Sequence, residues 1–120
     1  MGWEIEFTDE WGEWYWSLTE EQQDAVVARL EMLEDQGPTL GRPTAAEIDG
    51  SKVPHLKELR CSKDGALRIL FVFDPRRCAV LLVGGDKTGR WKDWYREAIP
   101  EAERLYEVLL EELREEGEIS

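Results

Sequence analysis

Apolar and polar residues alternate at the start of the chain. Trp3, Ile5 and Phe7 are separated by glutamates, and this period of two predicts a short strand with one buried face. A helix capped by Thr8 or Asp9 is expected next, because apolar side chains recur at spacings of three and four and so fall on one side. These side chains are Trp11, Trp14, Tyr15 and Leu18.

A second helix is indicated over residues 20–36. Thr19 with Gln22 three positions later has the form of a capping box, and Gly37 followed by Pro38 is a typical helix stop. The apolar stripe of this helix consists of Val26, Val27, Leu30 and Leu33. Two consecutive helices after one strand imply a helical hairpin laid across a sheet.

Three strands are predicted in the middle of the chain. They follow residues 38–54, whose many turn formers predict an irregular loop with a short helical turn near residues 45–48. Only short turn sequences separate the three strands, so they should form an antiparallel meander. The strands cover residues 55–61, 67–74 and 78–83.

The last part of the chain predicts two helices. Thr88 can cap a short helix that carries Trp91, and Pro100 is typical of the first turn of a terminal helix. The terminal helix has an apolar stripe of Ala102, Leu105, Tyr106, Leu109, Leu110 and Leu113. The predicted order is therefore β-α-α-β-β-β-α-α, an α+β fold with helices packed on a mostly antiparallel four-stranded sheet. Residues 1–120 are expected to form a single domain.

Charge is strongly segregated along the chain. The formal net charge is −12, yet residues 52–96 hold eleven of the fifteen Lys and Arg against five acidic residues, a local excess of six positive charges. Such segregation indicates that the basic segment meets a polyanion while the acidic remainder does something else. Because the overall charge opposes loose binding to nucleic acid, any nucleic-acid site must be local.

The distribution of apolar residues also indicates the cellular compartment. The longest apolar runs are strand-sized and far shorter than a bilayer span, and the first residues lack the basic flank and apolar core of a signal peptide. We therefore expect a cytoplasmic protein with no membrane partner. In a reducing compartment Cys61 and Cys78 should be free, half-buried thiols near opposite ends of the sheet.

Neither a metal nor another cofactor is expected. One His and two separated cysteines do not provide the usual zinc-ligand spacings. Residues 84–89, Gly-Gly-Asp-Lys-Thr-Gly, superficially resemble a phosphate loop. They lack its spacing and follow no parallel strand, so we interpret them as a strand-to-helix turn.

A basic constellation with aromatic neighbours is the strongest functional signal. The predicted element order can bring Lys57, Arg68 and Lys87 to one concave edge, together with Tyr95 or Trp91. Such a cluster suits RNA scission by attack of a ribose 2′-hydroxyl on the adjacent phosphate. Cationic donors stabilise the growing phosphoryl charge, each worth roughly 10²–10³ in rate, and aromatic side chains stack on splayed bases.

The basic residues also have structural interpretations. Arg60 should project from the opposite face to Lys57, where pairing with a carboxylate such as Glu58 or Glu47 is the more common outcome. For Lys57 and Arg68 the sequence pattern favours neither a structural nor a functional role.

The neighbouring aromatic and imidazole side chains have similar alternatives. Trp91 and Trp94 fit a role in core packing. His55, next to Pro54 at the start of a strand, fits a surface position better than the role of a base. The residues by themselves leave these alternatives open.

One long segment resembles a known family. LKELRCSKDGALRILFVFDPRRCAVLLVGGDKTGRWKDWYREAIPEAERLY is similar to the phage-derived HigB-like branch of the RelE/ParE toxin superfamily, most strongly over residues 53–110. The resemblance rests on Lys-Glu-Leu-Arg, the Arg-Ile-Leu-Phe strand, Gly-Gly-Asp-Lys and Trp-Tyr in that order. Toxins of this kind are commonly basic overall, and this chain departs from them in its acidic remainder.

The resemblance implies a metal-independent endoribonuclease, an mRNA interferase of a type II toxin–antitoxin system. By position, Arg68 matches the arginine placed against the scissile phosphate and Lys87 the basic residue after the last strand. Lys57 and Arg60 match the basic positions of the preceding strand, and Tyr95 or Trp91 matches the late aromatic. We hypothesise that Lys57 or Tyr95 transfers protons and that Arg68 and Lys87 clamp the phosphate. These four are the expected catalytic residues. The expected RNA-binding residues are Arg60, Arg90, Trp91 and His55.

The resemblance also implies partners. They are mRNA in the ribosomal A site and a cognate helix-turn-helix antitoxin, through which operator DNA would be contacted only indirectly. Two other functions on the same fold stay open. One is a ParE-like toxin that inhibits DNA gyrase without cutting RNA, and the other is a non-toxic binding module.

Overall fold

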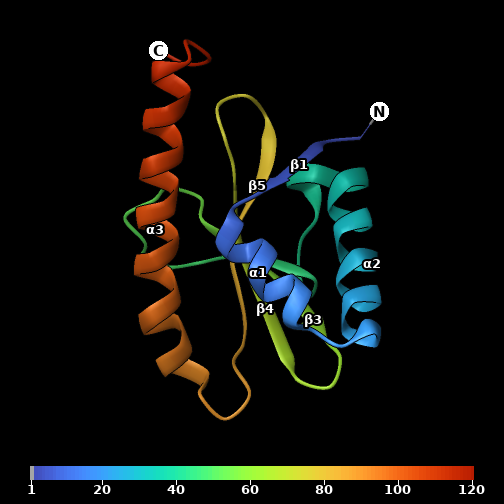
Figure 1. Ribbon diagram of the computed structural model, residues 1–120. Coiled ribbons are helices and arrows are strands. Elements are labelled where there is room, and N and C mark those ends of the chain that lie inside the picture. The colour runs from blue at the N-terminus through green and yellow to red at the C-terminus, as the bar shows by residue number, and fades with distance from the viewer. Residues whose placement is uncertain (1) are drawn as a thin grey trace.

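The fold is a sheet covered by helices on both faces. The computed structural model describes residues 2–120. Figure 1 shows α3 along one side of the molecule and α2 along the other, with α1 crossing between them. The elements in chain order are β1 (Glu4–Phe7), α1 (Asp9–Ser17), α2 (Glu20–Gln36), the 3-10 turn η1 (Gly37–Thr39), β2 (Ala45–Glu47), β3 (Lys57–Ser62), β4 (Ala66–Phe73), β5 (Cys78–Asp86) and α3 (Trp91–Glu115).

The sheet has five strands in the order β1-β5-β4-β3-β2. The predicted antiparallel meander of β3, β4 and β5 is confirmed. β1 joins β5 in parallel, with Glu4 opposite Cys78, so β1 and β2 are the two edges of the sheet. The predicted α+β class and mostly antiparallel sheet are therefore correct, whereas the predicted count of four strands is wrong.

The additional strand is β2, which lies where a helical turn was expected. Ala45 and Ala46 are both buried and pair with β3 in antiparallel register. Hydrogen bonds from Arg60 N to Thr44 O (2.8 Å) and from Ile48 N to Leu56 O (2.8 Å) continue this pairing beyond the strand. A three-residue strand buried on both faces shows no period-two pattern, so its sequence carries no strand signal.

Two hydrophobic cores lie on opposite faces of the sheet. Because successive strand residues point to opposite faces, Ile69 and Phe71 of β4 pack with α1 and α2. Leu70 and Val72, between and beyond them, pack with α3. The face to which a side chain points therefore decides which helical layer it meets.

Two glycines let tryptophans approach β5 closely from both faces. A β-carbon at Gly84 would lie 2.2 Å from Trp14 of α1, and one at Gly85 would lie 2.3 Å from Trp94 of α3. These glycines stand inside β5, which continues to Asp86 instead of ending at residue 83 as predicted. They serve helix packing, so the likeness of residues 84–89 to a phosphate loop has a structural explanation.

The predicted ends of the first two helices are confirmed. Thr8 Oγ1 accepts a hydrogen bond from Trp11 N (3.1 Å), which caps α1. Thr19 and Gln22 form both bonds of the capping box at the start of α2. Gly37 ends α2 with a φ of 55°, a conformation that glycine adopts without strain.

The prediction of two C-terminal helices is wrong, because α3 runs without a break through Pro100. Burial of Ala98 and Ala102 on either side of the proline holds the helix together where one backbone hydrogen bond is missing. Thr88 does not cap it, since Arg90 holds that position and the Thr88 hydroxyl accepts from Ala66 N (2.8 Å). No helix within residues 2–120 has the length and apolarity needed to cross a membrane.

The two cysteines are free, as predicted, but they are fully buried and not half-buried. Cys61 belongs to the core under α1 and α2, whereas Cys78 belongs to the core under α3. The sheet thus separates the two thiols, because each packs into a different core.

Candidate active site

A buried carboxylate organises the basic side chains on the α3 face of the sheet. Glu58 of β3 is only 4% exposed. Its Oε2 accepts hydrogen bonds from Nε and Nη2 of Arg60 (3.2 and 3.0 Å), and its Oε1 accepts one from the Tyr95 hydroxyl at 2.5 Å. A buried carboxylate is stable only with such partners. The hydrogen bond to Tyr95 therefore ties β3 to the first turns of α3.

Arg68 approaches the same carboxylate from β4. It stands directly opposite Arg60 in the sheet register, and its side chain is 11% exposed. Its Nη1 donates to Leu67 O at 2.9 Å. Its Nε lies 3.6 Å from Glu58 Oε1, too far for a hydrogen bond, and has no other acceptor among residues 2–120. Arg68 thus places a largely buried positive charge beside Glu58.

Lys87, just after β5, completes the group from a third direction. Its Nζ lies 3.3 Å from the Tyr95 hydroxyl and 5.1 Å from the ring centroids of both Tyr95 and Trp91. Cation–π attraction to the two rings holds the ammonium group in place. Trp91 itself is 60% exposed, so much of its ring remains free for stacking.

The surroundings shift two pKa values in a direction useful for proton transfer. Burial, followed by the charge of Arg68, lowers the pKa of Lys87. Burial, followed by the hydrogen bond to Glu58, raises the pKa of Tyr95 to about 12. Near neutral pH the Tyr95 phenol therefore keeps its proton, whereas Lys87 releases its proton more readily than an ordinary lysine.

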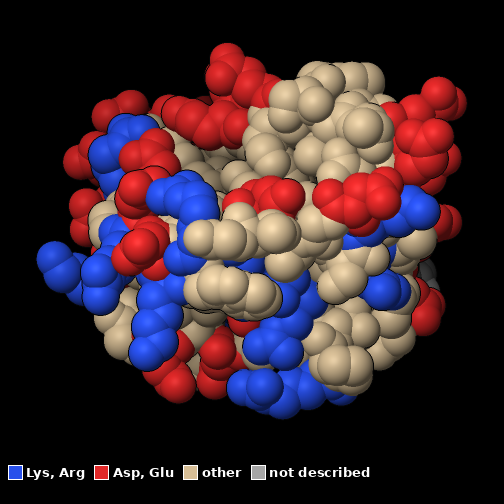
Figure 2. Space-filling model, turned by 90° about the horizontal axis from the view of Figure 1, so that it is seen from below, with Lys and Arg blue, Asp and Glu red and all other residues tan. Residues whose placement is uncertain are grey.

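We call this group the Glu58 cluster. Its members are Glu58, Arg60, Arg68, Lys87 and Tyr95. Three cationic side chains surround one carboxylate, so the cluster carries an excess of positive charge that can attract an anion. Figure 2 views the end of the molecule where α3 begins, and Lys and Arg gather in the middle and lower part of that face while most acidic side chains lie toward its edges.

The structure does not bring Lys57 into the cluster, so the expected convergence of Lys57 with Arg68 and Lys87 is wrong. Lys57 lies on the other face of β3, with Nζ 5.5 Å from the ring centroid of Phe73, a residue packed against the core under α1 and α2. The cause is the alternation of side chains along the strand. Glu58, the next residue, points to the α3 face.

The structure also places the other residues for which the sequence allowed either a structural or a functional role. Arg60 pairs with Glu58, as its structural interpretation predicted, and this pairing also places it in the cluster. His55 is a surface residue, as expected, with a φ of 62° and Nδ1 2.8 Å from Glu47. Arg90 forms its own ion pair with Glu97 (2.6 Å).

The two late tryptophans differ. Trp94 is buried against Gly85, which confirms its predicted role in core packing. Trp91 is exposed, so the same prediction is wrong for Trp91. Trp91 is the first residue of α3, with a φ of 35°, and its ring lies beside Lys87 instead of in the core.

Sequence reasoning missed Glu58, the residue at the centre of the site. A signal was present, because Glu58 and Arg60 are two residues apart and so lie on one face of the predicted strand. A buried acid requires a cationic partner, and such pairs mark functional sites more often than chance.

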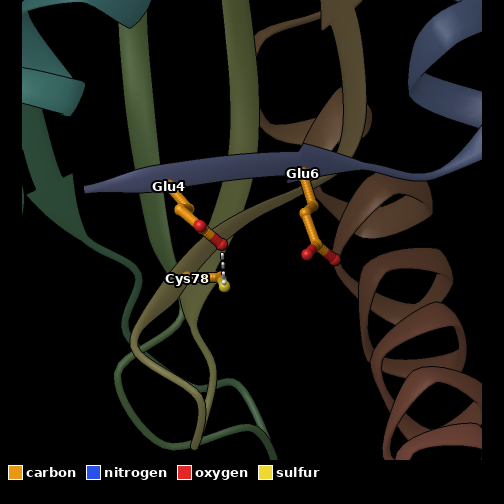
Figure 3. A group of neighbouring side chains, drawn as sticks. All are labelled: Glu4, Glu6 and Cys78. Atoms are coloured by element: carbon orange, nitrogen blue, oxygen red, sulfur yellow. Dashed lines mark hydrogen bonds between the residues drawn. The ribbon is translucent and has the colours of Figure 1, made fainter. Parts of the chain in front are cut away.

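A second group of acidic and thiol side chains lies at the opposite edge of the sheet. Glu4, Glu6 and Cys78 place potential ligand atoms within 4.8 Å of one another, and Figure 3 shows both carboxylates directed to the same side as the sulfur. Arg76 already binds Glu6 at 2.8 and 3.2 Å. Burial raises the pKa of the Cys78 thiol to about 11, which disfavours the thiolate that a metal needs. We assign no metal to this group.

Comparison with solved structures defines the class of fold. A mutant of E. coli toxin RelE in the free state matches 83% of this chain and 97% of its own, with a TM-score of 0.62 at 12% identity. A chain of the intact E. coli RelBE toxin-antitoxin complex matches 70% of this chain and 95% of its own, with a TM-score of 0.56 at 8% identity. The protein therefore has a RelE-like fold.

Sequence comparison identifies the family. The model of the phage-derived Gp49-like protein family matches residues 13–107. The protein named toxin HigB3 of Mycobacterium tuberculosis is 44% identical over 94 residues, which span 78% of this chain and 82% of that protein. Toxin HigB2 of the same organism is 42% identical over 95 residues, which span 47% of its length. The chain belongs to the phage-derived Gp49-like family and is a HigB-like member of the RelE toxin superfamily.

Proposed function

We propose that this protein is the toxin of a type II toxin–antitoxin system and acts in the cytoplasm as a ribosome-dependent endoribonuclease that cuts mRNA in the A site. One observation carries the proposal. The buried Glu58 carboxylate holds Arg60, Arg68 and Tyr95 on one face of the sheet, with Lys87 next to the Tyr95 hydroxyl. The same group can bind a phosphate and move a proton.

The first chemical step is the attack of a ribose 2′-hydroxyl on the adjacent phosphorus. Glu58 is too buried to reach the ribose directly, but the Tyr95 hydroxyl connects it to the site. As the 2′-oxygen attacks, its proton passes to the Tyr95 oxygen while the Tyr95 proton passes to Glu58. A positioned base of this kind contributes about 10²–10⁴ in rate.

Positive charge stabilises the phosphorane that forms. The guanidinium charge of Arg68 stabilises a non-bridging oxygen from one side, and Lys87 contacts the phosphate from the other side. Single donors of this kind contribute about 10²–10³ in rate. Arg60 holds the Glu58 carboxylate in place through two hydrogen bonds.

The second step is the departure of the 5′-oxygen. Lys87 gives its proton to the leaving oxygen, a role that suits a lysine with a lowered pKa. The products are a 2′,3′-cyclic phosphate and a 5′-hydroxyl, and no metal takes part. The exposed ring of Trp91 can stack on a base next to the cut.

The proposed partner that neutralises the toxin is a co-encoded helix-turn-helix antitoxin. The likeness to the E. coli RelBE toxin-antitoxin complex supports an antitoxin partner. The acidic remainder of the chain, which opposes binding to free RNA, supports cleavage that depends on the ribosome to present the message.

The test is expression of the chain without an antitoxin. Growth should stop, and primer extension should reveal new message ends inside translated codons, carrying 5′-hydroxyl groups. Arg68→Ala should give neither effect. Growth arrest with intact messages and altered DNA supercoiling would reject RNA cleavage in favour of gyrase inhibition.

A further inference from the structure

Several large apolar side chains remain exposed at one place on the molecule. Trp16 is 74% exposed, Phe7 58% and Val27 40%. All three line a groove of about 480 Å³ between β1, α1 and α2. A cluster of exposed aromatic and aliphatic side chains on one surface marks an interaction site more often than scattered apolar residues do.

The groove has a continuous apolar floor. Ile5 of β1, Tyr15 of α1 and Leu30 of α2 belong to its lining and pack against the core beneath. Gly12 leaves the wall of α1 without a side chain. β1 is an edge strand, so no strand of the sheet covers the groove from outside.

The rim of the groove is acidic. Glu31 and Glu34 line it, and a neighbouring hollow that shares Phe7 and Trp16 is lined by Asp9 and Glu13. The lining residues of both hollows include no Lys or Arg within the described part of the chain. An apolar floor with an anionic rim is complementary to an apolar stripe flanked by cations.

The wall of α2 matches the repeat of a helix. Val27, Leu30, Glu31 and Glu34 recur at spacings of three and four, so the wall is about two helical turns, roughly 10 Å, long. A helix whose apolar side chains follow the same spacing can lie along it.

We propose that this groove is the docking site for an amphipathic helix of a partner polypeptide, with a stripe of large aliphatic side chains flanked by Lys and Arg. A second copy of this chain is a poor occupant, because the two acidic rims would face each other in a protein of net charge −12. The groove lies on the α1/α2 face, whereas the Glu58 cluster lies on the α3 face. The interface is thus separate from the proposed nuclease site.

The test uses an 18-residue probe peptide with Leu at helical spacing and Lys on the flanks. Its binding to the full chain is measured by amide chemical shifts and by fluorescence anisotropy at physiological salt. Saturable shifts should cluster at residues such as Gly12, Val27 and Glu31. Trp16→Ser combined with Val27→Ser should weaken binding at least about tenfold. Val108→Ser, which removes an equally exposed apolar side chain from α3, should not.

Three results would overturn the proposal. They are shifts spread over the acidic surface, equal binding of a peptide with the same composition but no apolar stripe, and self-association of the chain that the double variant abolishes. Cleavage of mRNA is scored separately on the wild-type chain. Peptide binding without cleavage would overturn the nuclease alone, and cleavage without binding would overturn the groove alone.

Discussion

The Tyr95 hydroxyl donates a 2.5 Å hydrogen bond to Oε1 of Glu58, across 37 positions of sequence. This contact joins the start of α3 to the middle of the sheet. Arg68 approaches the same oxygen, with its Nε at 3.6 Å. The proposed proton path depends on the hydrogen bond between Tyr95 and Glu58.

Replacement of the central carboxylate should affect both activity and stability. Glu58→Gln removes the final proton acceptor, so the cleavage rate should fall by about 10²–10⁴. It also leaves Arg60 and Arg68 without their counter-charge, which should cost about 1–3 kcal/mol of unfolding free energy. Urea denaturation and a cleavage assay measure the two effects. Glu47→Gln, on an exposed acid paired with His55, is the matched control and should change neither.

Removal of the Tyr95 hydroxyl should lower the cleavage rate without unfolding the protein. Tyr95→Phe keeps the ring against Lys87 but breaks the proton path, so the rate should fall by about 10²–10⁴ with little change in RNA affinity. Tyr106→Phe is the control, because Tyr106 is a partly buried tyrosine of the same helix that packs against the core away from the cluster. Equal activity of Tyr95→Phe and the wild type would exclude the proposed relay.

The Tyr95 phenol should also shape the stability of the protein at alkaline pH. Its pKa rises from 10.0 to about 12 on folding, so the folded chain keeps a proton that the unfolded chain loses in between. The stabilisation is complete below pH 10 and should decline as the pH rises through 12. Ultraviolet titration of the three tyrosines should show a phase near pH 12 that Tyr95→Phe removes. Titration of all three near pH 10 would contradict the observed burial.

The glycines of β5 should be required for packing and not for binding phosphate. A β-carbon at Gly85 would lie 2.3 Å from Trp94, so Gly85→Ala should destabilise the fold by about 1–3 kcal/mol through overpacking. Gly41→Ala is the control, since the nearest atom, Thr39 O, is 3.9 Å from the added carbon. Thermal unfolding compares the two. A destabilisation by Gly41→Ala equal to that by Gly85→Ala would reject this explanation.

The sequence predicted well those features that local patterns control. The caps at Thr8 and Thr19 and the meander of three strands follow from residues close together in the chain. The alternation of side chains along a strand also predicted that Arg60 and Lys57 point to opposite faces. It could not show which of them faces α3, because that depends on packing between distant segments.

The errors have the same origin. β2 pairs through only three residues, and Pro100 stays within α3 because burial on both sides outweighs one lost hydrogen bond. Glu58 was missed because its importance arises from Arg68 and Tyr95, which are distant in sequence. Only the assembled sheet and helix bring these side chains to one carboxylate.

Two lysines test the central claim most directly, since Lys57 and Lys87 lie on opposite faces of the sheet and only Lys87 contacts Tyr95. The measurement is the single-turnover cleavage rate of mRNA on purified, programmed ribosomes for Lys57→Ala and Lys87→Ala. A cluster centred on Glu58 predicts that Lys87→Ala loses about 10²-fold or more, whereas Lys57→Ala stays within a few-fold of the wild type. Loss of cleavage in Lys57→Ala with normal cleavage in Lys87→Ala would contradict the assignment of the site.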